Sequence, residues 1–398
     1  MGEWKSCTLS SLGTIVGGAT PSTKKPENYE GGTIPWITPK DLSGFSGRYI
    51  SHGERNITEK GLNSCSAQMM PKHSVLFSSR ATIGYVAISD CEVCTNQAFK
   101  SIVPNENTDY LFLYYLLQYK KKDIENLGSG TTFKEVSANT MKNVEVRVPA
   151  EKNEQIRIAR VLSAIDDKIE ANTRINENLE QQLRSVFMEL FSDKIANVEA
   201  NNHRPLGELV INIDNRGKTP PLETTPTEYP IIDVRALSGT SRIVNYANCT
   251  KFVSAETYSS WFRSGHPKPK DILISTVGSL AEIKIFLGSK GCIAQNVVGF
   301  RTKDISPYYL YQYLTAIKND LVAYNIGSVQ PSIKVTHIIK HPIYIPSTEE
   351  LETFDALAES ATDAIYNNTL ESERLAGIRD ALIPKLMSGE IDLSKVQL

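Results

Sequence analysis

The second half of the 398-residue chain repeats the first half at an offset of about 197 residues. Short segments correspond in the same order and at similar spacing along the whole length. PWITPKDLSG at 35–44 matches PIIDVRALSG at 230–239, SVLFSS at 74–79 matches DILIST at 271–276, and KNVEVRVP at 142–149 matches IKHPIYIP at 339–346. A two-copy repeat of this length indicates a duplicated domain. It predicts an approximate two-fold axis and a partner with two comparable sites.

Each copy ends in a long segment with helical periodicity. Between 154 and 191 there is neither Pro nor Gly, and residues spaced alternately four and three apart form a heptad seam. The first seam consists of Ile158, Leu162, Ile165, Ile169, Asn172, Asn176, Leu179, Leu183, Val186 and Leu190. The second consists of Phe354, Ala358, Ala361, Ile365, Asn368, Ser372, Leu375, Arg379, Leu382 and Leu386. Arg379 breaks the second seam, and we expect the neighbouring Ile378 to take its place.

The two helices are expected to pair with each other. A two-fold axis across them makes them antiparallel, which places Asn172 opposite Ser372 and Asn176 opposite Asn368. Buried polar residues at seam positions can fix the register of a coiled coil. At 1.5 Å per residue, a seam of roughly 33 residues makes a rod of about 50 Å. The minimum role of the rod is to close the molecule, and it would also hold the flanking domains at a fixed separation.

The remaining segments mix short β-rich runs with turns and one helix. Strands are expected at 34–38, 75–78, 85–88, 98–103 and 144–148 with a buried helix at 110–119, and again at 231–234, 272–275 and 283–287. The predicted fold class is α+β, with two pseudo-two-fold related mixed α/β domains and two long helices in an antiparallel coiled coil. The boundaries are a domain at 1–150, a helix at 151–192, a linker at 193–204, a domain at 205–346, a helix at 347–389 and a tail at 390–398.

Charge is distributed unevenly, although the net charge is only −2. Residues 1–150 and 201–346 carry net charges of +2 and +6. Residues 151–200 and 347–398 carry −3 and −7. A polyanion would be attracted to the globular parts and repelled from the helical parts. For residues 1–150 alone, ordinary variation between domains explains the small excess equally well.

No motif for chemistry stands out. We find no phosphate-binding loop, no H-E-x-x-H, no G-x-S-x-G and no methyltransferase motif. Cys91 and Cys94 form a lone C-x-x-C, which without a second pair favours structural thiols over zinc. The N-terminus has no apolar signal core, and no apolar run is long enough to span a membrane. We therefore expect a cytoplasmic adaptor with no catalytic residue, no metal and no cofactor.

Several strings give the chain a family resemblance. LIPKLMSGEI at 382–391, EQIRIARVLSAIDDKIEANTRINENLE at 154–180, GSVQPSI at 327–333 and the opening Trp4, Lys5 and Leu9 resemble the DNA specificity subunit of Type I restriction–modification systems. The resemblance covers essentially the full length. Two departures are the Ala-rich second helix, which lacks the Glu-Gln start of the first, and GSGTTFKEV in the first domain, where the usual string has Gln-Pro.

The resemblance implies two target recognition domains, each followed by a conserved helix, with the helices packed as an antiparallel coiled coil that docks modification subunits. The implied partners are double-stranded DNA, two methyltransferase subunits and, through these, the restriction subunits. Base flipping and methyl transfer would belong to the methyltransferase. A specificity module of a methyltransferase-only system is the related alternative. The alternative of a different class is an adaptor that binds proteins and not DNA. A salt-dependent mobility shift of DNA with the purified protein would distinguish it from a DNA-binding subunit.

Candidate DNA contacts are polar residues at loops and strand ends that recur in both copies. Lys40 and Arg235 occupy matching turns, and the amides near 96 and 295 suit adenine edges. A turn cap or a solvated side chain is the alternative for each residue, so we expect about half of them to approach DNA. The candidates are Lys40, Arg80, Asn96, Gln97, Thr131, Thr132, Lys134, Arg235, Ser275, Thr276, Gln295, Asn296, Gln330, Ser332 and Lys334.

Overall fold

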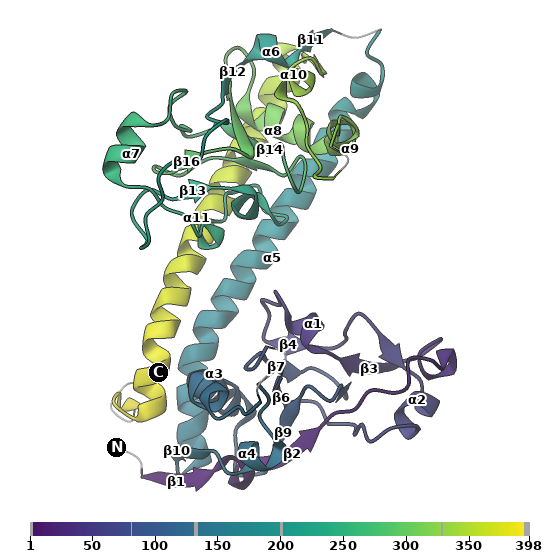
Figure 1. Cartoon of the computed structure of the whole chain (residues 1–398), viewed down its shortest axis with the longest axis vertical. Helices are drawn as coiled ribbons and strands as arrows, with labels where there is room; N and C mark the ends of the chain where they lie inside the picture. The colour runs from purple at the N-terminus through teal and green to yellow at the C-terminus, as the bar shows by residue number, and fades with distance from the viewer. Residues whose placement is uncertain (1–2, 81, 131–133, 200–201, 328, 394–398) are drawn as a thin grey trace. The chain divides into compact units, whose positions relative to one another are not determined.

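The computed structural model describes residues 3–80, 82–130, 134–199, 202–327 and 329–393 (Figure 1). The chain divides into two compact units. The first unit comprises Met1–Glu170 with Ser372–Leu398, and the second comprises Ala171–Glu371. The long helices α5 (Lys152–Ala196) and α11 (Thr348–Ser388) both cross this division. Each unit is therefore one mixed α/β domain packed on one half of each long helix.

The described residues of the first unit form three sheets in its domain. The largest has the strand order β2-β9-β6-β7-β4, and the others have the orders β5-β3-β8 and β1-β10. The strands are β1 (Trp4–Thr8), β2 (Gly13–Gly17), β3 (Ile34–Ile37), β4 (Tyr49–Ile50), β5 (Asn56–Ile57), β6 (Val75–Phe77), β7 (Val86–Ser89), β8 (Cys94–Thr95), β9 (Lys100–Pro104) and β10 (Glu145–Pro149). The helices are α1 (Pro39–Leu42), α2 (Glu59–Asn63), α3 (Tyr110–Asn126) and α4 (Ala138–Lys142).

The domain of the second unit repeats this plan. Its largest sheet has the order β12-β17-β14-β15, beside the pairs β13-β16 and β11-β18. The strands are β11 (His203–Pro205), β12 (Val210–Ile213), β13 (Ile231–Ile232), β14 (Ile272–Ser275), β15 (Ile283–Ile285), β16 (Cys292–Ile293), β17 (Val297–Thr302) and β18 (Pro342–Tyr344). The helices are α6 (Leu206–Leu209), α7 (Ala255–Ser260), α8 (Pro307–Ala316), α9 (Lys318–Ala323) and α10 (Val335–Ile338).

Strand pairing confirms that the two domains are copies. β3 pairs with β8 in parallel, as β13 pairs with β16, and both contacts join the segments that the sequence repeat aligns. β1 pairs with β10 antiparallel, as β11 pairs with β18, so that each domain is closed by its own first and last strands. The predicted α+β class with two pseudo-symmetric domains and paired long helices is confirmed.

Each domain packs its central helix between its main sheet and the long helices. Asp109 caps the N-terminus of α3, because its carboxylate accepts a hydrogen bond from the Phe112 amide at 2.8 Å. The helix continues beyond the predicted end at 119 to Asn126. In the first unit, Phe112 shares a core with Phe77 of β6 and Leu162 of α5. An aromatic cluster fills the corresponding place in the second unit, formed by Phe187, Phe191, Tyr309, Tyr313 and Phe354.

A buried arginine ties each domain to the helices. Arg48 Nε donates to Glu170 of α5 at 2.9 Å, and its guanidinium also bonds Asp167. In the second unit, Arg242 is 1 % exposed and donates to Glu180 at 2.8–3.0 Å and to Thr362 of α11 at 2.7 Å. Breaking a buried pair by removing one partner costs about 3–5 kcal/mol. These bonds therefore fix how each domain sits on the helices within its own unit.

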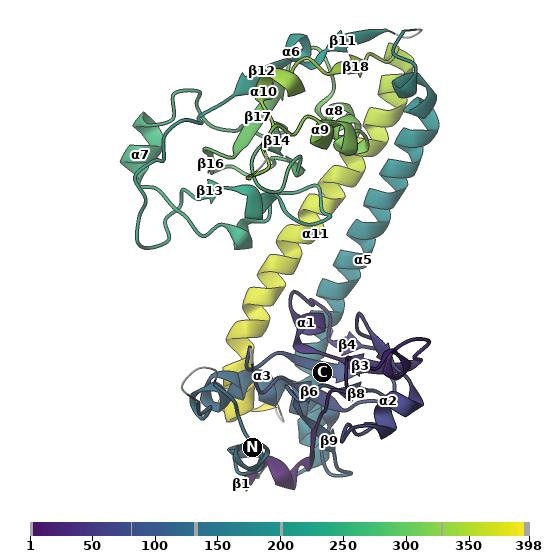
Figure 2. The same cartoon turned by 45° about the vertical axis from the view of Figure 1, so that its right-hand side comes forward.

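Within each unit the halves of α5 and α11 run antiparallel, side by side in both views (Figures 1 and 2). The predicted pairing of Asn176 with Asn368 is confirmed, because Asn368 Nδ2 donates to Asn176 Oδ1 at 2.9 Å. Asn172 is buried, and its Nδ2 donates to Glu371 at 2.8 Å and to the Asn368 carbonyl at 3.3 Å. The remaining described seam residues are also buried or half-buried: Ile158, Leu162, Ile165, Ile169, Leu179, Leu183, Val186 and Leu190 on α5, and Phe354, Ala358, Ala361, Ile365, Ser372, Leu375, Leu382 and Leu386 on α11.

Two helix predictions are wrong. Ile378 does not replace Arg379 in the seam, because Ile378 is 41 % exposed while Arg379 donates to the buried carboxylate of Asp166 at 2.7 Å. The expected linker at 193–204 is also too long. α5 continues to Ala196 because Lys194 still finds a partner in Glu350 of α11, and β11 already begins at His203.

Candidate nucleic-acid interface

In both domains a buried serine holds the turn after a central strand. Ser78 Oγ donates to the Thr82 carbonyl at 2.6 Å and accepts from the Tyr85 amide at 2.8 Å. Ser275 makes the same two bonds in the second domain, at 2.5 and 2.8 Å. The repeat therefore extends to individual side-chain hydrogen bonds. The loop that follows Ser78 in the first domain corresponds to the loop that follows Ser275 in the second.

The prediction that Ser275 and Thr276 contact DNA is wrong for this structure. Both side chains are completely buried. The Ser275 hydroxyl is occupied by the turn, and Thr276 Oγ1 donates to the Asn296 carbonyl at 3.3 Å. Buried hydroxyl groups that are satisfied within the protein are not available to a ligand. These two residues support the loops that lie above them.

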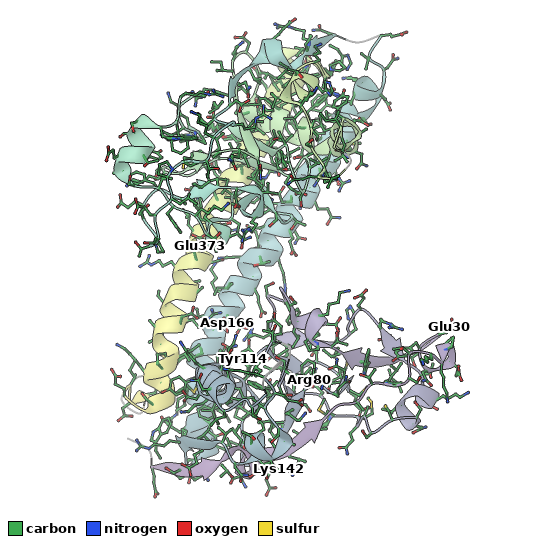
Figure 3. The ribbon with its side chains drawn as sticks, viewed as in Figure 1. Glu30, Arg80, Tyr114, Lys142, Asp166 and Glu373 are labelled. Atoms are coloured by element: carbon green, nitrogen blue, oxygen red, sulfur yellow. The ribbon has the colours of Figure 1, made fainter. Side chains whose placement is uncertain are left out.

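A polar loop cluster surrounds this turn in the first domain. Glu135 lies between two cations, with a carboxylate oxygen 3.6 Å from Arg80 and the other 3.6 Å from Lys100. Lys100 Nζ also lies 3.5 Å from the backbone carbonyl of Gln97. Gln97 itself is exposed. Lys134 is exposed beside Glu135. We call Arg80, Gln97, Lys100, Lys134 and Glu135 the first loop cluster; Arg80 is labelled in Figure 3.

The second domain gathers a comparable set around a hollow of about 210 Å³. Three predicted residues, Arg235, Gln295 and Asn296, line it together with Lys251 and Thr219. Gln295 Nε2 donates to Thr219 Oγ1 at 2.5 Å. These five residues form the second loop cluster. The structure therefore brings together residues that are 76 positions apart in the sequence.

A second hollow, of about 450 Å³, is lined by Ile333, which backbone hydrogen bonds of Thr276 connect to Asn296 of the second loop cluster. The Thr276 amide donates to the Asn296 carbonyl at 2.7 Å, and its carbonyl accepts from the Ile333 amide at 2.8 Å. Arg216 and the predicted residues Ser332 and Lys334 line this hollow. The predicted Gln330 is exposed on the same loop.

An ion pair lies at the edge of this second hollow. Arg216 donates to Asp214 at 2.7 and 2.9 Å. Burial opposes ionisation of Asp214, but the hydrogen bonds from Arg216 outweigh it and lower the pKa of that carboxyl. Arg216 is therefore held in place as a fixed cation beside Lys334.

The other candidates are placed less favourably. Lys40 is well exposed on α1, but its ammonium group is paired with Glu54 at 2.6 Å, which raises the pKa of Lys40. Asn96 Oδ1 accepts from the Ala98 amide at 3.0 Å and so shapes its own turn. Thr131 and Thr132 lie outside the described residues.

The chemistry of both clusters suits a nucleic acid. Exposed Lys and Arg side chains neutralise phosphates, whereas amides and guanidinium groups bond to base edges. Each cluster mixes these groups on loops that a rigid sheet supports. The two clusters share a scaffold but differ in most of their side chains.

No three His, Cys, Asp or Glu side chains gather into a metal-binding group anywhere in the described part of the chain. All six cysteines are free thiols. Burial raises the pKa of Cys94 and that of Cys292 to about 12. Both thiols donate to the carbonyl of a proline on the neighbouring segment, at 3.4 and 3.5 Å, and so have a structural place in the two copies. Among the described helices, none is both long and apolar enough to cross a membrane.

The fold defines a protein with two copies of one mixed α/β domain, each packed on a pair of long helices. Comparison with known proteins identifies the family. The family model for the Type I restriction modification DNA specificity domain matches twice, at residues 1–181 and 200–368. The chain belongs to this DNA specificity family, and its two domains recognise DNA sequence.

Individual relatives agree with this assignment. The chain is 32% identical over 415 residues to the specificity subunit of the Type I restriction enzyme MjaIX of Methanocaldococcus jannaschii, covering 99% of this chain and 95% of the relative. It is 31% identical over 199 residues to the EcoR124I/EcoR124II specificity subunit of Escherichia coli, covering 48% of this chain and 47% of the relative. A crystal structure of the Type I S subunit of M. genitalium has the same fold, with a TM-score of 0.58 and 19% identity over 97% of this chain and 96% of that one.

Sequence reasoning missed six residues of these surfaces: Thr20, Lys100, Glu135, Arg216, Thr219 and Lys251. Thr20 belongs to the first surface because its hydroxyl donates to Gln97 Oε1. The two threonines had a visible signal, since each precedes a proline in GATP at 18–21 and GKTP at 217–220. Glu135 and Lys100 had none, because only the fold brings them to Arg80. A search limited to matching positions also overlooks partners that one copy alone possesses.

Proposed function

We propose that each domain reads one half of a bipartite, asymmetric DNA site through its loop cluster. The observation that carries the proposal is the equivalence of the two turns, held by Ser78 and Ser275, beneath loops whose exposed side chains differ. A shared scaffold places both surfaces against a duplex in the same way. Different side chains then select different bases.

In the first domain, Arg80, Lys100 and Lys134 supply the cations, and Gln97 supplies an amide. In the second domain, Arg235 and Lys251 supply cations beside Gln295 and Asn296, and Arg216 and Lys334 extend the surface. Bidentate contacts of Arg with guanine and of Asn or Gln with adenine each give about 1–3 kcal/mol of discrimination. The arginines and Asn296 are therefore the proposed base-reading groups, and the lysines the proposed phosphate contacts.

The proposed partners follow from the family and from the helix pairs. We propose that the chain scaffolds two methyltransferase subunits, and through them restriction subunits, in the cytoplasm, and that it performs no chemistry and holds no cofactor itself. The duplicated helix pairs support two equivalent docking sites. The relatives named above are specificity subunits of restriction enzymes, which agrees with a role in a larger assembly.

A domain exchange tests the reading of half-sites. The full chain, assembled with its methyltransferase subunits, is used to select duplexes from a library with a fully randomised centre, and the bound sequences are compared. Replacing residues 1–150 with the corresponding domain of a relative should change one half of the selected site and preserve the other. A change in both halves, or no selected sequence for the parent chain, would overturn the proposal.

A further inference from the structure

One pair of side chains is the same in both domains. The Thr20 hydroxyl donates to Gln97 Oε1 in the first domain, and Gln295 Nε2 donates to Thr219 Oγ1 at 2.5 Å in the second. Each threonine precedes a proline, and each glutamine follows a short strand, β8 or β16. This pair is therefore an exception to the general difference between the two loop clusters.

The backbone around the pair is also built twice. β8 pairs in parallel with β3, which contains Pro35, and β16 pairs in parallel with β13, which begins one residue after Pro230. In each copy, the carbonyl of that proline accepts from a cysteine thiol. In the first domain, the Ala19 amide donates to the Thr95 carbonyl at 3.0 Å, which fixes the threonine loop against the glutamine loop. The two domains thus share the parallel strand pairing and the thiol contact that precede the exposed glutamine.

Both glutamines are exposed next to buried neighbours, Ala98 and Ala294. Gln295 has a φ of 42°, in the left-handed region that a non-glycine residue rarely adopts. An exposed polar side chain gains nothing for the core from such a conformation. Backbone strain of this kind is commonly found where a side chain must be aimed at a ligand.

We infer that Gln97 and Gln295 are positioning contacts to DNA phosphates rather than readers of bases; this inference rests on the proposed function. Residues that read two different half-sites must differ, so a pair common to both domains serves what the half-sites share. Every duplex shares its phosphate backbone, and phosphate contacts fix the register of a protein on DNA.

The hydrogen bond with the threonine determines which atom of the glutamine side-chain amide points away from the protein. Phosphate oxygens only accept hydrogen bonds, so the glutamine must present its nitrogen to DNA and its oxygen to the threonine hydroxyl. Thr20 and Gln97 already have this arrangement. A half-turn of the Gln295 amide gives the same arrangement in the second domain, because the Thr219 hydroxyl can donate as well as accept.

The test uses the full chain assembled with its methyltransferase subunits. The parent protein first selects a preferred duplex from a library with a randomised centre, and affinities of the variants are measured on that duplex and on unselected duplex. Gln97→Ala and Gln295→Ala should each weaken binding about fivefold on both duplexes, the loss expected for a single hydrogen bond. Repeated selection with each variant should return the parent sequence. Gln68→Ala, at an exposed glutamine of the first domain outside these loops, is the matched control and should bind like the parent.

The threonine variants separate aiming from folding. Thr20→Ser keeps the hydroxyl and should bind like the parent, whereas Thr20→Val should reproduce the loss seen for Gln97→Ala with an unchanged melting temperature. A glutamine variant that selects a different base at one position would make the residue a base reader and overturn the inference. Unchanged affinity in both glutamine variants would also overturn it. If the parent selects no sequence, the proposed function itself fails, which is a different result from either.

Discussion

The guanidinium group of Arg379 donates to the carboxylate of Asp166 at 2.7 Å, at a position in the helix seam where the heptad pattern calls for an apolar residue. Asp166 is 5 % exposed and also accepts from the Tyr115 hydroxyl at 2.6 Å. Figure 3 labels Asp166 on α5, which faces α3 and α11 within the first unit. The buried carboxylate of Asp166 thus accepts hydrogen bonds both from Tyr115 of the domain and from Arg379 of α11.

Removing this cation should destabilise the first unit. In Arg379→Leu, Asp166 keeps only its bond to Tyr115, and an uncompensated buried charge costs about 3–5 kcal/mol. The free energy of unfolding, measured in urea, should fall by that amount. Asp166→Asn combined with Arg379→Leu removes the charge as well and should recover most of the loss. Equal losses in the single and double variants would show that the charge is not responsible.

Lys284 provides a prediction for pH. Its side chain is buried, its ammonium group donates to the Gly239 carbonyl at 2.6 Å, and burial lowers its pKa to about 8. Between pH 8 and the unfolded value near 10.5, the unfolded chain binds more protons at this residue than the folded chain does. The contribution of Lys284 to stability therefore increases as pH rises through this window.

The corresponding experiment compares the parent with Lys284→Met. The difference in unfolding free energy between them should shift in favour of the parent by up to about 3 kcal/mol between pH 7.5 and 10.5. Other titrating groups cancel in this difference. Lys340→Met, which replaces a lysine elsewhere in the same domain, serves as the control for the exchange of a lysine for methionine. A constant difference for Lys284→Met would contradict the prediction.

Glu135 should restrain binding to DNA of any sequence. Its carboxylate lies between Arg80 and Lys100, and a phosphate would have to compete with it for both cations. Glu135→Gln should strengthen binding to unselected duplex and steepen the dependence of log K on log salt by about one unit for each additional phosphate contact. Filter binding or anisotropy over a range of salt concentrations measures both. Glu125→Gln on α3 is the matched control, and an unchanged salt slope in Glu135→Gln would refute the competition.

The helix pair should set the distance between the two half-sites. An insertion of four residues near Asn172 would lengthen α5 by roughly 6 Å, close to the length of two base pairs, and would also disturb its register with α11. The spacer in the selected DNA should then lengthen or binding should weaken. An inserted chain that selects the original spacer with full affinity would show that the helices do not measure this distance.

The sequence predicted the duplicated architecture well because hydrophobic period and repeated order are properties of the chain itself. The seam from Ile158 to Leu183 and the Asn176–Asn368 pair followed from spacing alone. Arg379 could not be predicted in this way, since its place in the seam depends on Asp166, more than two hundred positions away. The heptad pattern predicts that a position is buried, but it does not predict which polar group a buried polar residue at that position will contact.

The candidate surfaces were predicted only in part for a related reason. Arg235, Gln295 and Asn296 do come together around one hollow. Ser275 and Thr276 were chosen because they end a strand, but the chain at that point still faces inward and uses their hydroxyl groups to build the turn. Whether a polar residue at a strand end is exposed depends on the loops packed over it, and these come from distant segments.

The division of the chain has a consequence for its synthesis. The second unit is a continuous stretch that ends at Glu371, whereas the first unit includes the last residues of the chain. Leu386 and Met387 belong to the core of the first domain, and Gly389 lies so close to Trp4 that a β-carbon there would come within 2.8 Å of the indole. The first domain is therefore synthesised before the second, but it is completed only after the second half of α11 has been made. Until then, the part of its core that this helix covers stays exposed.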